Sequence, residues 1–352
     1  MNRVNINSFI VACSILVAGC CNDNQVGSID FDSFAQAELS PMAICCDLVA
    51  PQSLFLVERS LLITDKYNEK LVTVVPLDSL DASRRIINYG NGPHEFLKIS
   101  SIWGNSDRGF CEINDDFRRS VSRYLLTDDL CLSDDTFVDS DSYSGLADVL
   151  SLAPLPCGHI ATGGFSDGLF CYYDEDFDVK QVFGPAPEND GALSKVFAMK
   201  HQGTVTCSPD GKFLAFGEMY SDAISFYERK GDTFDLVRTY GSYDPDVDII
   251  SQSVNGTEYV AVMESDNSIR GYRDICAAGE CFYALYWGVP VNKVSESNNC
   301  CFIIRFSSEG KVEGGYRFDR LLRSAVIDPS SMTLYALSFS VEGNDELLRC
   351  QL

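Results

Sequence analysis

A short pattern that returns three times along the chain constrains the fold most strongly. Residues 85–90, 179–184 and 236–241 each alternate apolar and polar side chains and close on an aromatic residue followed by glycine. The first two copies are about two repeats of 40–50 residues apart, and the third follows after one long repeat. Recurrence at such a period indicates a repeat architecture in which each unit buries its apolar face against its neighbours.

The segments between these copies consist of short strand patterns separated by turns. Residues 54–57, 61–65 and 71–75 are apolar runs of strand length, and no amphipathic pattern of fifteen or more residues at helical spacing occurs. Short antiparallel strands leave a sandwich, a barrel or a propeller, and the repeat favours the propeller. We therefore predict an all-β, six-bladed β-propeller of four-stranded antiparallel blades over residues 43–352, closed by a strand at 42–48 that pairs with residues 347–352.

Turn chemistry supports the predicted hairpins. Ser208-Pro209-Asp210-Gly211-Lys212 lies between two apolar strands, where proline presets the turn, aspartate bonds its own backbone and glycine supplies a positive φ. A degraded copy, Asp328-Pro329-Ser330-Ser331, precedes another apolar strand. Glycines at 163, 164 and 168 also lie between strands with no helix to follow, so a blade turn is predicted there rather than a phosphate loop.

These motifs resemble a known family. The Ser-Pro-Asp-Gly-Lys turn and the junction Gly90-Asn91-Gly92-Pro93-His94-Glu95-Phe96 are similar to those of TolB-like six-bladed propeller lipoproteins from anaerobic Gram-negative bacteria. His94 stands where that junction often carries glycine. Further similarity lies at 281–288, a strand ending in aromatic-glycine. It continues at 303–312, a hairpin, and at 316–319, the strand after that hairpin. The resemblance implies a fold and a compartment, and no activity, because the family's members are mostly uncharacterised.

The junction itself has a structural interpretation. Gly90 and Gly92 permit a tight crossover between blades, Pro93 stiffens it, Phe96 wedges between blades, and Glu95 accepts from backbone amides. The alternative is an acid/base pair formed by His94 and Glu95, which we regard as the weaker interpretation.

The N-terminus predicts the compartment. Arg3 precedes an apolar stretch, residues 9–18, which is too short to span a bilayer but suits a signal peptide. Leu16-Val17-Ala18-Gly19-Cys20 then resembles a bacterial lipobox, which implies lipid attachment at Cys20; the alternative is an ordinary signal peptide that contains a cysteine. We predict a signal peptide at 1–19, the lipidated cysteine and a polar spacer at 20–42, and an outer-membrane lipoprotein of the cell envelope whose periplasmic or surface side is left open.

Fifteen cysteines would suggest disulfides in an exported protein. After Cys13 in the signal and Cys20 an odd number is left, and many of these lie in apolar strands, where they resemble small buried hydrophobic residues. We predict mostly free thiols, with Cys276 and Cys281 as the best candidates for a bridge across a hairpin. Zinc is disfavoured, since no Cys-x-x-Cys occurs and histidine is scarce.

The net charge of −24 disfavours binding to nucleic acid or to anionic lipid surfaces. His94, His159 and His201 are interpreted as solvated loop residues, no Gly-x-Ser-x-Gly motif is present, and no catalytic or metal-binding residue is predicted. No cofactor is expected, except that a structural calcium ion is left open, because acidic clusters offer oxygen ligands without the spacing of a calcium loop. These clusters are at 115–116, 128–129, 134–135 and 174–176. Paired-carboxylate glycosidase chemistry is not excluded by the sequence.

Propellers present variable loops on a rigid ring, and loops carry specificity. We therefore predict a monomeric binding or scaffold module, attached to the membrane by its N-terminal lipid alone. Its partner would be an envelope protein or a small-molecule or glycan ligand, which the sequence does not identify. The loops at Tyr220-Ser221-Asp222 and Tyr243 are candidates to stack on sugars, with packing between blades as the alternative. The alternative function is a hydrolase or lyase that acts on glycan or peptide at the channel mouth.

Overall fold

The structure, a computed structural model, describes most of the chain after residue 27. The described residues are 28–66, 68–105, 109–127, 130, 132–133, 135–143, 149–186, 194–254, 257–296, 299–340 and 345–352. The predicted signal peptide, Cys20 and the acidic residues 128, 129 and 134 lie outside them.

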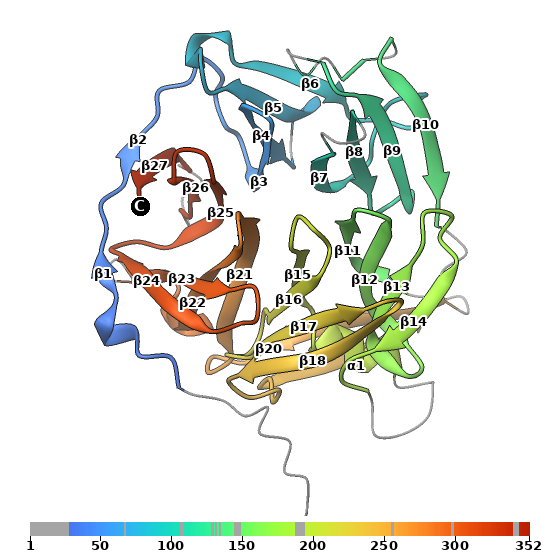
Figure 1. Ribbon diagram of the computed structural model, residues 1–352, viewed down its shortest axis with the longest axis vertical. Helices are drawn as coiled ribbons and strands as arrows, with labels where there is room; N and C mark the ends of the chain where they lie inside the picture. Colours follow the sequence, from blue (N-terminus) through green and yellow to red (C-terminus); the bar gives the residue numbers. More distant parts are fainter. Residues whose placement is uncertain are drawn as a thin grey trace, which may run out of the picture.

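Six four-stranded antiparallel sheets are arranged around a central axis as a six-bladed β-propeller (Figure 1), which confirms the predicted fold. Blade 1 contains β3 (Pro51–Val57), β4 (Ser60–Asp65), β5 (Lys70–Pro76) and β6 (Arg84–Asn88). Blade 2 contains β7 (Ile99–Asn105), β8 (Phe110–Asp115), β9 (Ser120–Leu125) and β10 (Phe137–Ser142). Blade 3 contains β11 (Val149–Leu155), β12 (Gly158–Phe165), β13 (Gly168–Tyr173) and β14 (Val179–Phe183).

Blade 4 contains β15 (Gly203–Cys207), β16 (Phe213–Glu218), β17 (Ile224–Lys230) and β18 (Thr233–Tyr240). Blade 5 contains β21 (Ile269–Ala278), β22 (Cys281–Pro290), β23 (Cys301–Ser307) and β24 (Val312–Phe318). Blade 6 contains β25 (Leu322–Asp328), β26 (Thr333–Ser338), β27 (Leu347–Gln351) and the N-terminal β2 (Ser40–Pro41). The first strand of each blade lies nearest the axis (Figure 1).

A two-stranded sheet, one short helix and several 3₁₀ turns lie outside the six blades. A two-stranded sheet of β19 (Val247–Val254) and β20 (Thr257–Glu264) is inserted between blades 4 and 5, and the short helix α1 (Ser194–Lys200) contacts it and β12. Single 3₁₀ turns are η1 (Phe31–Ser33), η2 (Leu80–Ala82) and η4 (Val291–Lys293). Within the described residues, no helix combines the length and apolar character that crossing a membrane requires.

Each interface between neighbouring blades has its own hydrophobic core, six in all. The core between blades 4 and 5, for example, brings Phe226 of β17 against Phe282 of β22 and Phe306 of β23. Side chains alternate along each strand, so apolar side chains lie on both faces of a blade. The neighbouring blades cover both faces. The strands therefore read as nearly continuous apolar runs.

The ring closes through the N-terminal segment, as predicted, but at a different place. Ser40 and Pro41 pair with Arg349 and Leu348 of β27, whereas the predicted strand at 42–48 is wrong. Pro51 begins the first strand of blade 1, so residues 42–48 serve as the crossover, and Met42 is buried in the core between blades 6 and 1.

Residues 28–42, part of the predicted polar spacer, contact the propeller. Strand β1 (Ala35–Gln36) pairs in parallel with β24 at the outer edge of blade 5, and the chain then continues to blade 6 (Figure 1). Phe31 stacks on Tyr286 with ring centroids 5.3 Å apart, and Phe34 packs against the same core. Two aromatic side chains in an otherwise polar segment explain why it is held on the ring.

The repeated motifs occupy equivalent places. The three aromatic-glycine copies end β6, β14 and β18, the outer strands of blades 1, 3 and 4. In the Asp210 turn the carboxylate accepts from the Ser208 hydroxyl at 2.7 Å and from the Lys212 amide at 3.1 Å, and Gly211 has φ 67°. The segment at 281–288 differs, since its aromatic-glycine pair lies in β22, the second strand of blade 5.

All cysteines among the described residues are free thiols. The predicted bridge between Cys276 and Cys281 is wrong, because the register pairs Cys276 with Tyr283 and Cys281 with Ala278. The two cysteines are thus diagonal neighbours across β21 and β22, which places their Cα atoms about 7–8 Å apart. That separation exceeds what a disulfide spans.

Candidate functional site

Three arginines gather where blades 4, 5 and 6 meet at one end of their strands. Arg270 and Arg273 lie near the start of β21, and Arg323 lies near the start of β25, both of which are innermost strands. The end of β16 adjoins them, since the Gly271 amide donates to the Met219 carbonyl at 2.8 Å. We call Arg270, Arg273 and Arg323 the arginine cluster.

Each arginine of the cluster lies over an aromatic ring. The guanidinium carbon of Arg270 is 5.7 Å from the ring centroid of Tyr220. Arg273 lies over Trp287 and Arg323 over Phe339, both at 5.0 Å. Trp287 and Phe339 contact each other edge to face with centroids 5.0 Å apart, and the Trp287 indole N–H donates to the Leu322 carbonyl at 2.7 Å.

The cluster carries one positive charge more than its acidic partners neutralise. Arg270 pairs with Glu264 of β20 at 2.5 Å, and Arg323 pairs with Asp345 at 2.9 Å. No acidic side chain of the described residues pairs with Arg273 in this way, and its buried Nε and Nη1 have no hydrogen-bond partner. Burial, together with the neighbouring charge of Arg270, lowers the pKa of Arg273 to about 10. The group still carries its charge at neutral pH.

A buried polar link lies beside the cluster. The Asp274 carboxylate accepts from the Ser324 hydroxyl and from the Ala325 amide, the latter at 3.1 Å. Ser324 in turn accepts from the Leu54 amide at 3.0 Å. Burial raises the pKa of Asp274. The chain of contacts joins the innermost strands of blades 5, 6 and 1 and so fixes the backbone that carries Arg273 and Arg323.

The prediction that the three histidines are solvated is wrong for two of them. His201 is 7% exposed and its Nδ1 lies 2.7 Å from Glu218, which is fully buried and also accepts from the Ser221 hydroxyl. His159 is also 7% exposed and stacks on Phe177 with centroids 4.7 Å apart. Both histidines follow turn-like sequence, but neighbouring elements cover them, which a local pattern does not report.

The Gly90–Phe96 junction is a crossover between blades 1 and 2. Glu95 accepts from the Gly92 amide at 2.7 Å, as predicted, and Phe96 is buried between blades 1 and 2. The His94 ring packs against Phe137 at 4.4 Å. A cavity of about 200 Å³ adjoins this junction, with Arg118 among its lining residues.

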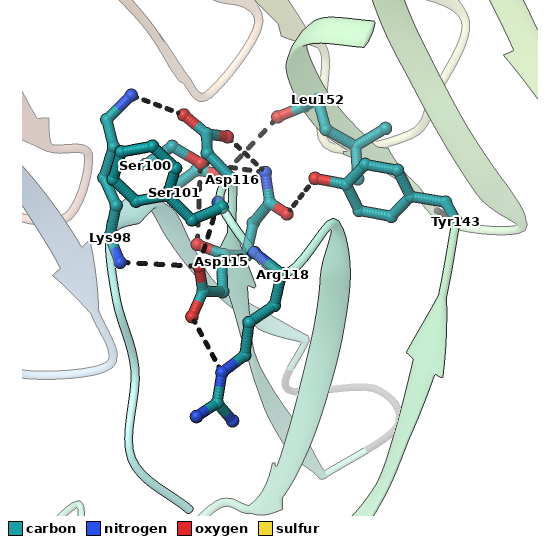
Figure 2. A network of polar contacts seen from close by, with 10 residues as sticks. Lys98, Ser100, Ser101, Asp115, Asp116, Arg118, Tyr143 and Leu152 are labelled. Carbon is teal, nitrogen blue, oxygen red and sulfur yellow. Dashed lines mark hydrogen bonds and ion pairs between the residues drawn. The ribbon is translucent and has the colours of Figure 1, made fainter. Parts of the chain in front are cut away.

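Asp115 fixes the backbone next to this junction, and Figure 2 shows the side chain beside Lys98 and Arg118. The side chain lies at the end of β8, fully buried, and accepts from the backbone amides of Leu97 at 2.8 Å, Phe117 at 3.0 Å and Arg118 at 3.1 Å. Arg118 then donates to the Gly90 carbonyl at 3.0 Å. The acidic pair 115–116, considered as a calcium ligand from sequence, is therefore occupied by backbone amides and by Lys98.

Replacing Asp115 by asparagine is expected to lower the free energy of unfolding by about 3 kcal/mol, because an amide NH₂ would face a backbone N–H and the charge-assisted bonds would be lost. The matched control is Asp116→Asn next to it, whose carboxylate contacts Lys98 at 2.8 Å at the surface. That control should cost less than about 1 kcal/mol. Urea unfolding of both variants measures the difference, and equal costs would contradict the assigned role.

The other predicted site residues do not converge. Asp174 accepts from the amides of Asp176 and Asp178, which makes the acidic run at 174–178 a blade turn. Tyr220 is 9% exposed and the Tyr243 hydroxyl bonds Ser225, so both tyrosines contribute to packing. Over the ranges that the structure describes, no group of three or more histidine, cysteine, aspartate or glutamate side chains is placed to hold a metal ion.

Sequence reasoning missed the arginine cluster for a physical reason. Residues 270 and 273 would point to opposite faces of a regular strand, because side chains alternate with a period of two. The pairing of β21 with β22 is irregular between Arg270 and Tyr272 and again between Tyr272 and Asp274. Such irregularities re-aim side chains. The third arginine comes from another blade, so no local signal joins the three.

Comparisons with known proteins support the fold alone. Neither a family model nor a curated protein matches the sequence. A putative exported protein of Bacteroides fragilis has a similar structure, with a TM-score of 0.55 and 13% identity over 92% of this chain and 96% of that one. A DUF4221 family member from Bacteroides vulgatus has a TM-score of 0.55 and 12% identity over 90% and 98%. The WD40 repeats of RRP9 have a TM-score of 0.52 and 9% identity over 91% and 99%.

Proposed function

We propose that this protein is a binding module of the bacterial cell envelope, tethered by a lipid on Cys20, which holds its ligand at the arginine cluster. The anchor rests on the lipobox-like sequence before Cys20. One structurally similar protein is described as a putative exported protein of Bacteroides fragilis, which agrees with an extracytoplasmic location.

The arginine cluster is the single observation that carries the proposal. Blades 5 and 6 contribute three positively charged side chains to one end of the ring, and an aromatic ring supports each of them. A rigid scaffold that presents supported polar groups is the arrangement that binding sites share. Two acidic side chains form ion pairs with the cluster, Glu264 with Arg270 and Asp345 with Arg323.

A ligand panel tests the proposal with the mature chain in detergent. Neutral saccharides, acidic saccharides and short peptides are screened by thermal shift, hits are quantified by calorimetry, and mass spectrometry follows every hit for chemical change. We expect a hit that stays chemically intact and binds at least about tenfold more weakly to Arg323→Met. The control is Arg59→Met, which removes an exposed arginine of the β3–β4 turn that pairs with Asp78.

Two results would overturn the proposal. Catalytic turnover of a saccharide or peptide would favour the alternative hydrolase or lyase. Binding that Arg323→Met leaves unchanged would move the site elsewhere on the ring.

A further inference from the structure

We propose that the arginine cluster binds an oxyanion, a carboxylate, phosphate or sulfate group of the ligand, and that Arg273 is its principal contact. This inference rests on the proposed function and names the chemistry that the site selects. Arginine presents its N–H groups in a planar fork that matches such anions in two-point contacts.

The stacking arrangement leaves this fork available. Aromatic rings contact the face of a guanidinium, whereas its N–H groups point outward in the plane. Trp287 therefore supports Arg273 without using any of its donors. Because Trp287 is itself fixed by its bond to the Leu322 carbonyl and by Phe339, the guanidinium is held before a ligand arrives. Preorganisation of this kind reduces the entropy lost on binding.

The unpartnered donors point to an anionic ligand. Nε and Nη1 of Arg273 and Nε of Arg323 are buried nitrogens without an acceptor. An unsatisfied buried donor costs about 1–3 kcal/mol, and more when the group is charged. An oxyanion between Arg273 and Arg323 would supply acceptors to both and would neutralise the surplus positive charge of the cluster.

One acidic side chain of the cluster opposes an incoming anion. Glu264 uses one carboxylate oxygen to pair with Arg270, and its other oxygen, Oε1, is buried without a partner. Its negative charge opposes that of an incoming anion. Glu264→Gln removes the negative charge and keeps the shape of the side chain, so it should strengthen anion binding. A purely structural role for Arg273 would not predict that increase.

Calorimetry on the mature chain in detergent tests the inference with sodium sulfate, sodium phosphate and sodium glucuronate, at constant ionic strength set by chloride. We expect at least one of the three to bind, Arg273→Met to weaken it by about tenfold or more, and Glu264→Gln to tighten it severalfold. Arg273→Lys keeps the charge and loses the fork, so its affinity should lie between those of the wild type and Arg273→Met. Arg59→Met is the charge-matched control and should bind like the wild type.

The choice among the anions distinguishes their sources. Binding of glucuronate alone identifies a carboxylate, as in an acidic saccharide, whereas preference for sulfate or phosphate identifies a tetrahedral group. Circular dichroism and thermal unfolding establish that each variant is folded, and Arg323→Met repeats the test if Arg273→Met is not.

Failure of the inference differs from failure of the proposed function. If no anion binds, or if Arg273→Met and Glu264→Gln bind like the wild type, the oxyanion site is wrong. A neutral ligand that requires Arg323 would still support the binding module in that case.

Discussion

A chain that begins at residue 43 is expected to lose about 3 kcal/mol or more of its free energy of unfolding relative to a chain that begins at residue 28. The truncation removes Met42, which is 8% exposed in the core between blades 6 and 1, together with the pairing of β2 with β27. Burial of one such side chain contributes about 1.5–3 kcal/mol, and the packing of Phe31 and Phe34 on blade 5 adds to it. Urea unfolding of both chains measures the difference.

The same truncation exposes an edge. Without β2, the backbone of β27 is left unpaired on its outer side, next to the buried Leu347 and Leu348. Exposed edges of this kind pair with other chains, so the shorter chain should also self-associate in light scattering.

A third chain that begins at residue 38 separates the two contributions, since it lacks η1 and β1 but keeps β2. We expect this chain to remain monomeric and to lose only part of the stability. If the chains from 28 and 43 unfold alike, β2 is dispensable and closure of the ring depends on the cores alone.

The second large effect is expected from Phe226→Ala, which should lower the free energy of unfolding by about 3–5 kcal/mol. Phe226 is fully buried and lies 4.9 Å from the ring of Phe306 and 6.0 Å from that of Phe282. The substitution leaves a cavity between two blades whose backbones are fixed by their own ladders, so the site collapses poorly.

Phe117→Ala is the matched control, because this ring is 71% exposed and its loss should change stability by less than about 0.5 kcal/mol. Phe226→Leu fills part of the cavity and should cost less than the alanine variant. Denaturant midpoints of the three variants give the comparison. A cost near that of Phe117→Ala at position 226 would mean that blades 4 and 5 adjust to the cavity.

The blade pattern was predictable because it is local. An outer strand that ends on an aromatic residue and glycine, such as 236–241, carries its own periodicity, and the turn at Asp210 and Gly211 carries its own φ requirement. Both are set by neighbours within a few residues, so both are visible in the sequence. The sequence predicted that the N-terminal segment closes the ring, but not which residues form the strand. A strand of two residues has almost no pattern of its own and takes its position from β27.

The burial of His159 and His201 was not predictable in the same way. Each follows a turn-like stretch, and each is covered by residues from elsewhere in the chain, such as Phe177 over His159. Exposure is a property of the assembled ring, whereas a local pattern reports only the conformation of the segment.

The sequence by itself therefore determined the type of repeat and the number of blades, because both follow from short-range periodicity. It also predicted the free state of most cysteines, because these lie in apolar strand segments. Only the tertiary structure decided which charged groups meet. Arg270 and Arg273 share a site because β21 departs from regular alternation, and Arg323 joins them from another blade. The packing of blade 6 against blade 5 brings together side chains about fifty residues apart, and no local signal in the chain records that contact.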